Sequence, residues 1–265
     1  DRNRTSPFAF TGNKFEFRSL GSAVNIACAN VMLNTAVAEE LRQFADELEG
    51  AEDFEKALMA LVKREIKAHK RIIFNGNGYS EEWQEEAARR GLANHRNTAE
   101  ALPCFVSQKS IDLFAEFGIL SESEVHSRYE VKLDKYTKLL NIEARVMIRM
   151  ARRTYLPAIS KYMRDLAETI TSVKAAIASS DMEEHEKLLS YLVKGTNAVA
   201  ACTRTLIAEH DSAEAIEDLQ EQAYAYAEKV IPAMDALRAE IDALECVVEN
   251  DYWPVPTYND ILFYN

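Results

Sequence analysis

Hydrophobic side chains recur every three or four residues along most of the chain, which is the spacing of one face of an α-helix. Residues 1–18, residues 92–106 and the C-terminal tail lack this period, so we interpret them as non-helical. The period predicts helices over the remaining segments, namely residues 22–49, 53–70, 80–91, 107–117, 121–178, 183–209 and 212–248. The chain is thus expected to be mainly α-helical.

The last predicted helix carries a nearly continuous heptad pattern of apolar residues. Its seam runs through Ile216, Leu219, Tyr226, Val230, Leu237, Ile241, Leu244 and Val248. This seam predicts coiled-coil-like antiparallel packing against the helix over 183–209, and hence a long-helix bundle. Pro157 and Pro232 fall inside two of the predicted helices. A proline lacks the N–H donor and clashes with the preceding turn, so we expect a kink at each.

The N-terminal segment follows a different pattern. Residues 11–13 read as a turn, and residues 14–18 alternate between charged and aromatic side chains as a β-strand does. Such a strand would place Lys14, Glu16 and Arg18 on one face and two phenylalanines on the other. It could be an edge strand with ordinary surface charges. It could equally be part of a site where an acid binds a divalent cation and arginines neutralise phosphate.

The composition argues against some classes of binding partner. The 265 residues carry a net charge of −12, which argues against binding to nucleic acid or to an anionic membrane. No run approaches the roughly 18 apolar residues that a membrane helix needs. The four cysteines are far apart and form no CxxC pair, so we expect buried, reduced thiols in a cytoplasmic protein. A non-polar C-terminal tail, rich in aromatic residues, is expected to lie against a surface.

Two further motifs favour structural roles. Helical di-iron sites use Glu-x-x-His, whereas Glu65–His69 and Glu122–His126 are one residue longer, so we interpret both as surface pairs. The glycines of residues 75–78 lack the Gly-Lys-Ser/Thr ending of a phosphate-binding loop. This stretch is therefore expected to be a connector between helices.

The run NRTSPFAFTGNKFEFR, at residues 3–18, resembles the last catalytic strands of type III glutamine synthetases. Residues 67–80 (KAHKRIIFNGNGYS), 126–130 (HSRYE) and 252–263 (YWPVPTYNDILF) are also similar to the C-terminal region of that family. The resemblance spans most of the chain. It implies that residues 1–49 are the end of a catalytic α+β domain, of which the strand is a remnant. Residues 50–265 would be a helical C-terminal domain.

The resemblance also implies an activity and a set of roles. Enzymes of this family join ammonia to glutamate through γ-glutamyl phosphate, using ATP and Mg²⁺ or Mn²⁺. By similarity, Glu16 is the ligand of a metal ion and Arg4 contacts the phosphate that ATP transfers. Arg18 is implied as a second catalytic arginine, near the substrate carboxylate, and Lys14 as an ATP contact. No cofactor is expected for the helical domain alone.

Several expectations concern the chain as a whole. The other metal carboxylates and the ATP pocket of the family are not recognisable, so this chain alone is expected to be inactive. Its partners would be an upstream catalytic domain and neighbouring subunits of a homo-oligomer. The alternative from another class is a stand-alone helical scaffold or protein-interaction module, which the helices and the aromatic tail suit equally well.

Overall fold

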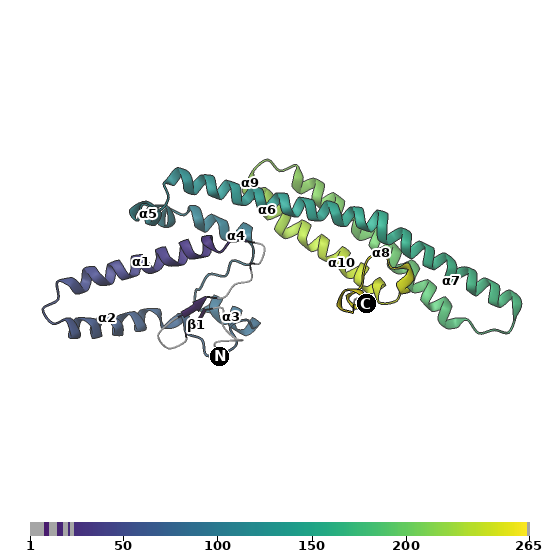
Figure 1. Cartoon of the computed structure of the whole chain (residues 1–265), viewed down its shortest axis with the longest axis horizontal. Helices are drawn as coiled ribbons and strands as arrows, with labels where there is room; N and C mark the ends of the chain where they lie inside the picture. The colour runs from purple at the N-terminus through teal and green to yellow at the C-terminus, as the bar shows by residue number, and fades with distance from the viewer. Residues whose placement is uncertain (1–7, 11–14, 18–20, 22–23, 264–265) are drawn as a thin grey trace. The chain divides into compact units, whose positions relative to one another are not determined.

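The structure is a computed structural model that describes residues 8–10, 15–17, 21 and 24–263. The chain forms two compact units. The first contains residues 1–96 and 103–126, and the second contains residues 97–102 and 127–265. Helices dominate both units, and a short β-hairpin precedes them (Figure 1). The predicted fold class, a mainly α bundle after a short β segment, is confirmed.

The first unit begins with the hairpin and continues as helices joined by short turns. Its elements are β1 (Phe8–Phe10), β2 (Phe15–Phe17), α1 (Ala27–Glu49), α2 (Phe54–His69), the 3₁₀-helix η1 (Lys70–Ile72), α3 (Glu81–Arg89) and α5 (Gln108–Glu116). Helix α2 begins where Asp53 accepts a hydrogen bond from the Lys56 N–H at 3.1 Å. Helix α3 begins similarly at Ser80, whose hydroxyl accepts from the Trp83 N–H at 3.4 Å. These N-caps satisfy donors that the first helical turn leaves unpaired.

Residues 75–78 connect α2 and α3, as predicted. Phe74 stacks on Trp83 with ring centroids 4.4 Å apart, which fixes the start of α3 against the end of α2. The Arg90 guanidinium lies over the Trp83 ring and donates to the carbonyls of Arg71 and Ile73 at 3.0 and 2.8 Å. The arginine therefore satisfies carbonyls that the helical segment ending at Ile72 leaves open.

Residues 92–106 are more regular than the pattern predicts. They contain α4 (Thr98–Ala101) and the 3₁₀-helix η2 (Leu102–Val106). Asn97 caps α4 by accepting from the Glu100 N–H at 2.9 Å. Gln220 donates to the Ala99 carbonyl at 2.8 Å, so α4 is held by a tertiary contact of the second unit. Helices this short span too few residues to show a period, which is why the sequence pattern missed them.

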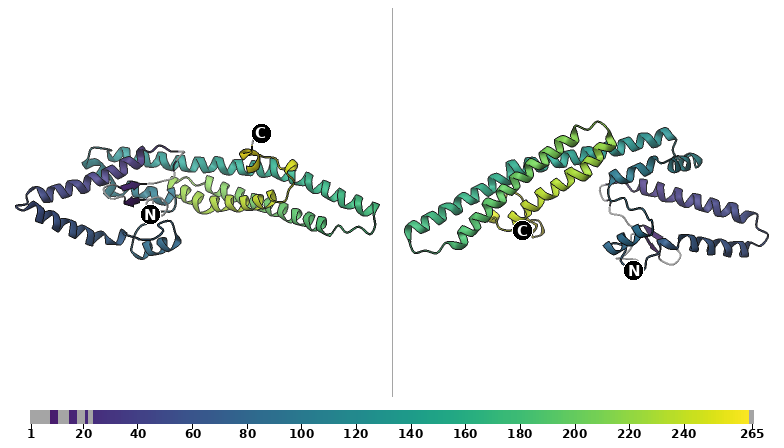
Figure 2. Two further views of the ribbon diagram at one scale, coloured as in Figure 1. Left: turned by 60° about the horizontal axis from the view of Figure 1, so that its bottom comes forward. Right: turned by 180° about the vertical axis from the view of Figure 1, so that it is seen from behind.

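Long helices form the second unit. Its elements are α6 (Glu122–Met150, which belongs to this unit from residue 127), α7 (Leu156–Ala176), α8 (Glu183–Glu214), α9 (Leu219–Ala225), α10 (Ile231–Glu245) and α11 (Tyr258–Leu262). Helix α8 packs along both α7 and α10 (Figure 2). Leu192, Val199 and Leu206 of α8 and Leu237 of α10 are fully buried in the shared core. The predicted packing of the last two helical segments is therefore confirmed.

The two helices approach most closely at Gly195. A Cβ atom placed on this glycine would lie 2.6 Å from Cδ2 of Leu244, closer than real atoms come. The absence of a side chain thus lets α8 and α10 pack tightly at this point.

Each of the two prolines follows a π-helical turn. The turns are η3 (Ala151–Tyr155), before Pro157, and η4 (Tyr226–Val230), before Pro232. In each, an N–H group bonds to the carbonyl five residues back, from Leu156 to Ala151 and from Ile231 to Tyr226. The wider turn accommodates the ring that would clash with the carbonyl four residues back. At each proline, where the sequence predicts a kink, the structure therefore has a π-helical turn.

The helix predicted over 212–248 is interrupted near its start. Helix α8 continues to Glu214, the chain then leaves the helix, and α9 begins after Asp218. Asp218 accepts from the Glu221 N–H at 2.8 Å and so caps the new helix. The prediction was wrong here because a capping aspartate inside an apolar period was read as part of the helix.

The C-terminal tail lies against the bundle over part of its length. Trp253 is buried and packs on Tyr155, with ring centroids 5.1 Å apart. Tyr252 packs on Tyr162 at 5.2 Å and donates its hydroxyl to Asp165. Phe263, by contrast, is exposed, so the predicted burial of the tail holds only for its first part.

Candidate functional site

The β-hairpin carries the predicted metal ligand. Strands β1 and β2 pair antiparallel, with Phe8 opposite Phe17, Ala9 opposite Glu16 and Phe10 opposite Phe15. Glu16 is thus the central residue of β2 and lies at a paired position in the ladder. The predicted strand over 14–18 is confirmed for residues 15–17.

The other predicted site residues lie outside the described residues. This applies to Arg4, Lys14 and Arg18, and also to the turn over 11–13. Their expected grouping with Glu16 on one face of the hairpin stays a prediction. The residues that the structure does describe offer other charged clusters, which are considered next.

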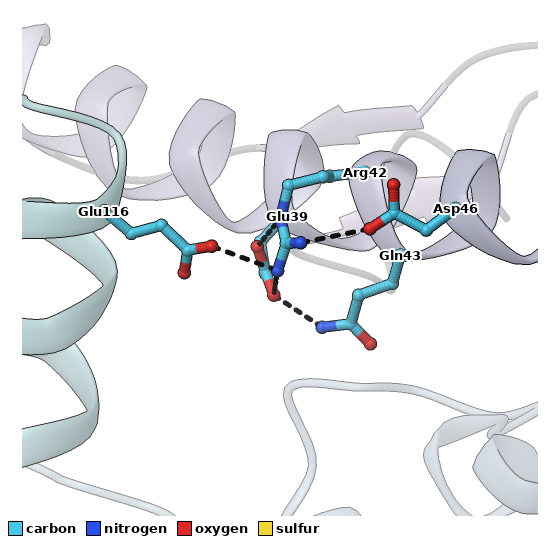
Figure 3. Close-up of polar contacts among 5 residues, drawn as sticks. All are labelled: Glu39, Arg42, Gln43, Asp46 and Glu116. Atoms are coloured by element: carbon cyan, nitrogen blue, oxygen red, sulfur yellow. Dashed lines mark hydrogen bonds and ion pairs between the residues drawn. The ribbon is translucent and has the colours of Figure 1, made fainter.

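Arg42 stands at the centre of a charged network on α1 (Figure 3). Its guanidinium contacts both carboxylate oxygens of Glu39, at 2.8 and 2.9 Å, and Asp46 at 3.1 Å. It also reaches Glu116 of α5 at 3.2 Å. Hydrogen bonds from Arg42 and then Gln43 lower the pKa of Glu39. One arginine faces three carboxylates, so the cluster links α1 to α5 and has no spare positive charge for an anionic ligand.

His210, Asp211 and Glu214 bring three possible metal-ligating groups within 4.8 Å of one another on α8. Glu214, however, already accepts from Asn141 at 3.0 Å and from Arg145 at 2.6 Å. Those hydrogen bonds lower its pKa. A guanidinium so close to the carboxylate repels a second cation. The cluster is therefore a neutralised hydrogen-bond network, which the sequence pattern did not single out.

Two sequence predictions about reactive side chains have different outcomes. Nε2 of His69 lies 3.2 Å from Glu65 at the surface of α2, so this pair is the surface pair that was predicted. None of the four cysteines forms a disulfide, as predicted, but Cys28, Cys104 and Cys246 are exposed, so the prediction of burial was wrong. These three lie at outward-facing positions, where the general preference of cysteine for burial does not apply.

A cavity of about 360 Å³ lies between the end of α6, α10 and the C-terminal tail. Met147, Met150, Ile241 and Val255 contribute apolar walls, and Asp242 and Glu245 lie among its charged lining. Arg238 of the same lining pairs with Asp242 at 3.1 Å. No nucleophile and base are paired among the residues that line this cavity. It therefore supports no catalytic assignment.

Comparisons with known proteins agree on one family. The family model for the glutamine synthetase C-terminal domain matches residues 57–174. A glutamine synthetase of Bacteroides fragilis (strain YCH46) is 36% identical over 271 residues, and a type-3 glutamine synthetase of Dictyostelium discoideum is 39% identical over 272. A glutamine synthetase of Butyrivibrio fibrisolvens is 34% identical over 277 residues. Each alignment covers 99% of this chain.

This chain belongs to the glutamine synthetase family and corresponds to its C-terminal portion. The relative from Dictyostelium supports the type III assignment made from the motifs. The chain spans 37–38% of the length of these relatives. Across the part of the chain that the structure describes, no helix is both long and apolar enough to cross a membrane.

Proposed function

We propose that this chain supplies the last part of the active site, and the helical C-terminal region, of an ATP-dependent glutamate–ammonia ligase. The similarity to enzymes named glutamine synthetase, over 99% of the chain, supports this proposal. The intact enzyme would act in the cytoplasm as a homo-oligomer. The boundary between the catalytic end and the helical domain, at residue 49, belongs to the same proposal.

The observation that carries the proposal is the uncovered apolar face of α1. The sequence period gives this helix an amphipathic face, yet Ile26, just before the helix, is 71% exposed and Val37 is 56% exposed. Leu41, on the same face as Val37, is exposed as well, and Thr35 is the buried residue of α1. Several exposed apolar side chains on one helix face favour a contact with another protein surface. A catalytic domain joined to this chain would provide that surface.

The hairpin supports the same interpretation. An isolated two-stranded hairpin is only marginally stable, and strands become stable when more strands extend the sheet. Strands β1 and β2 pair only with each other among the described residues. Further catalytic strands alongside them would complete both the sheet and the site.

The donor chemistry of the hairpin fits the proposed reaction. A carboxylate such as that of Glu16 is the hard oxygen ligand that Mg²⁺ and Mn²⁺ prefer. Arg4 and Arg18 would neutralise the negative charge that develops as phosphate is transferred, and Lys14 would contact ATP. The metal would draw electron density from the transferring phosphate. One carboxylate cannot hold such an ion alone, so the isolated chain is proposed to be inactive.

The test replaces Glu16 in the intact enzyme. We expect Glu16→Ala to remove most turnover and to weaken Mn²⁺ binding, measured by phosphate release and by titration calorimetry. Glu85→Ala, at an exposed position of α3, is the matched control and should behave like the unmodified enzyme. Near-normal turnover of the Glu16 variant would refute the role assigned to it. ATP- and glutamate-dependent phosphate release by the isolated 265-residue chain would refute its proposed inactivity.

A stand-alone scaffold remains the second candidate, and the second unit favours it because its core is well buried without any other protein. The coding sequence before Asp1 distinguishes the two. A region encoding a catalytic domain with further metal-binding glutamates supports the ligase. A stop codon or an unrelated domain supports the scaffold.

A further inference from the structure

Helix α6 is apolar on two opposite faces. One face, with Leu133, Leu140 and Ala144, is buried within the second unit. The other face is exposed and repeats at intervals of three or four residues. We call it the α6 seam, and it comprises Arg128, Val131, Lys135, Leu139, Ile142, Val146 and Arg149. All seven residues are exposed.

The seam is apolar from Leu139 to Val146, and its charged residues, Arg128, Lys135 and Arg149, are all basic. Leu139 and Ile142 are 49% and 59% exposed, which is unusual for large side chains on a helix that is well packed on its other side. Residues 128–153 contain eight Lys or Arg and three Asp or Glu, a net charge of +5 in a chain of net charge −12. The basic residues Arg128, Lys135 and Arg149 form no ion pair with any residue that the structure describes. The seam thus has the form of a coiled-coil contact for an acidic, partly apolar helix.

The chain contains a segment of that chemistry in its first unit. The end of α1, the turn after it and the start of α2, residues 39–55, contain eight acidic residues and one arginine, a net charge of −7. We call this segment the acidic tip. Leu41 is 60% exposed within it, and Phe54 is exposed too. The tip is therefore both apolar and acidic.

Part of the acidic charge of the tip is already neutralised. Glu39 and Asp46 pair with Arg42, and Glu47 pairs with Arg64 of α2 at 2.8 Å. Four exposed acids have no ion pair among the described residues, namely Glu40, Glu49, Glu52 and Glu55. These side chains are available to an external cation.

We propose that the acidic tip of one copy of this chain docks on the α6 seam of a second copy. Charge complementarity favours this occupant, because a segment of net charge −7 meets a seam whose three charged residues are all basic. The exposed Phe54 would cover part of the apolar middle of the seam. The contact joins different surfaces of the two copies, so it is heterologous and can propagate around a closed ring. The proposal rests on the oligomeric part of the proposed function and specifies the surfaces that carry it.

The test measures self-association of the 265-residue chain by sedimentation velocity over a concentration series. The seam variant carries Lys135→Glu and Arg149→Glu, and the tip variant carries Glu49→Lys and Glu52→Lys. Each should associate about tenfold more weakly than the unmodified chain, or worse. A 1:1 mixture of the two variants should associate again, because the reversed seam of one is complementary to the reversed tip of the other. Association should weaken with added salt, since the Debye length falls from about 10 Å at 0.1 M to about 3 Å at 1 M.

A matched control separates this contact from a general effect of charge. Lys109→Glu with Lys161→Glu makes the same change in net charge at exposed positions outside the seam, and it should leave association unchanged. Thermal unfolding of every variant checks that each is folded. A chain that stays monomeric at its highest soluble concentration overturns the proposal. So does a seam variant that associates normally, or a mixture that fails to associate. None of these results bears on turnover of the Glu16 variant, which tests the ligase separately.

Discussion

The two units follow the same helical period but use it differently. In the second unit the apolar residues of the period, such as Leu192 and Leu237, are fully buried. In the first unit the corresponding residues of α1, such as Val37 and Leu41, are more than half exposed. The period therefore identifies which face of a helix is apolar. It does not reveal whether the same stretch of chain contains the surface that covers that face.

The largest expected effect comes from truncating one buried side chain in the core of the second unit. Leu237→Ala should lower the free energy of unfolding of the 265-residue chain by about 2–5 kcal/mol, because it leaves a cavity between α8 and α10. Val37→Ala, the matched change on α1, should alter it by less than about 0.5 kcal/mol in this chain. Urea denaturation followed by circular dichroism measures both.

The same two substitutions, made in the intact enzyme, test whether a catalytic domain covers α1. If a catalytic domain covers α1, Val37→Ala should there become clearly destabilising. Equal effects of Leu237→Ala and Val37→Ala in the 265-residue chain would contradict the contrast between the two units.

A smaller effect is expected where α8 and α10 approach most closely. Gly195→Ala adds a Cβ atom that would lie 2.6 Å from the Leu244 side chain, so one of the two must shift. We expect a loss of about 1–3 kcal/mol from overpacking, partly offset by the better helix propensity of alanine. Gly50→Ala is the control, since nothing lies within 4 Å of its added atom. A Gly195 variant as stable as the Gly50 variant would show that the helices can separate freely.

The smallest effect concerns pH and the tail of the second unit. The hydrogen bond from the Tyr252 hydroxyl, and then that from Arg164, lowers the pKa of Asp165. A carboxyl with a lowered pKa stabilises the folded chain above its unfolded pKa, about 4, and this contribution is lost as pH falls through the folded value. Tyr252→Phe should therefore be less stable at neutral pH and lose less stability on acidification.

Thermal unfolding measured at a series of pH values checks this expectation. Tyr191→Phe, at an exposed tyrosine of α8, should keep the acid dependence of the unmodified chain. Parallel pH curves for the unmodified chain and the Tyr252 variant would contradict the assigned role of the hydroxyl.

Much of the fold could be predicted because it depends on local signals. The helices predicted from residues 53 and 80 do begin there, because Asp53 and Ser80 cap their first turns. One feature that was missed depends on a tertiary contact. Helix α4 is held by Gln220, which is more than a hundred residues away in sequence, and no local pattern signals that contact.

The candidate site was predicted to a lesser extent. Alternation identified the strand that contains Glu16, because a pleat repeats every two residues. Alternation could not assign Glu16 to a metal, since the same pattern also describes an edge strand. Only the family resemblance favours the metal. The exposure of the apolar residues of α1 and of the α6 seam was not predicted either. An apolar residue in a helical period is normally taken to be buried.

The π-helical turns before Pro157 and Pro232 have a consequence for the evolution of the chain length. Each turn holds one residue more than the α-helical turn that it replaces. Each therefore has the geometry of a single-residue insertion, which the helix absorbs without ending. A homologue with neither proline could lack one residue at each place and still keep the same bundle.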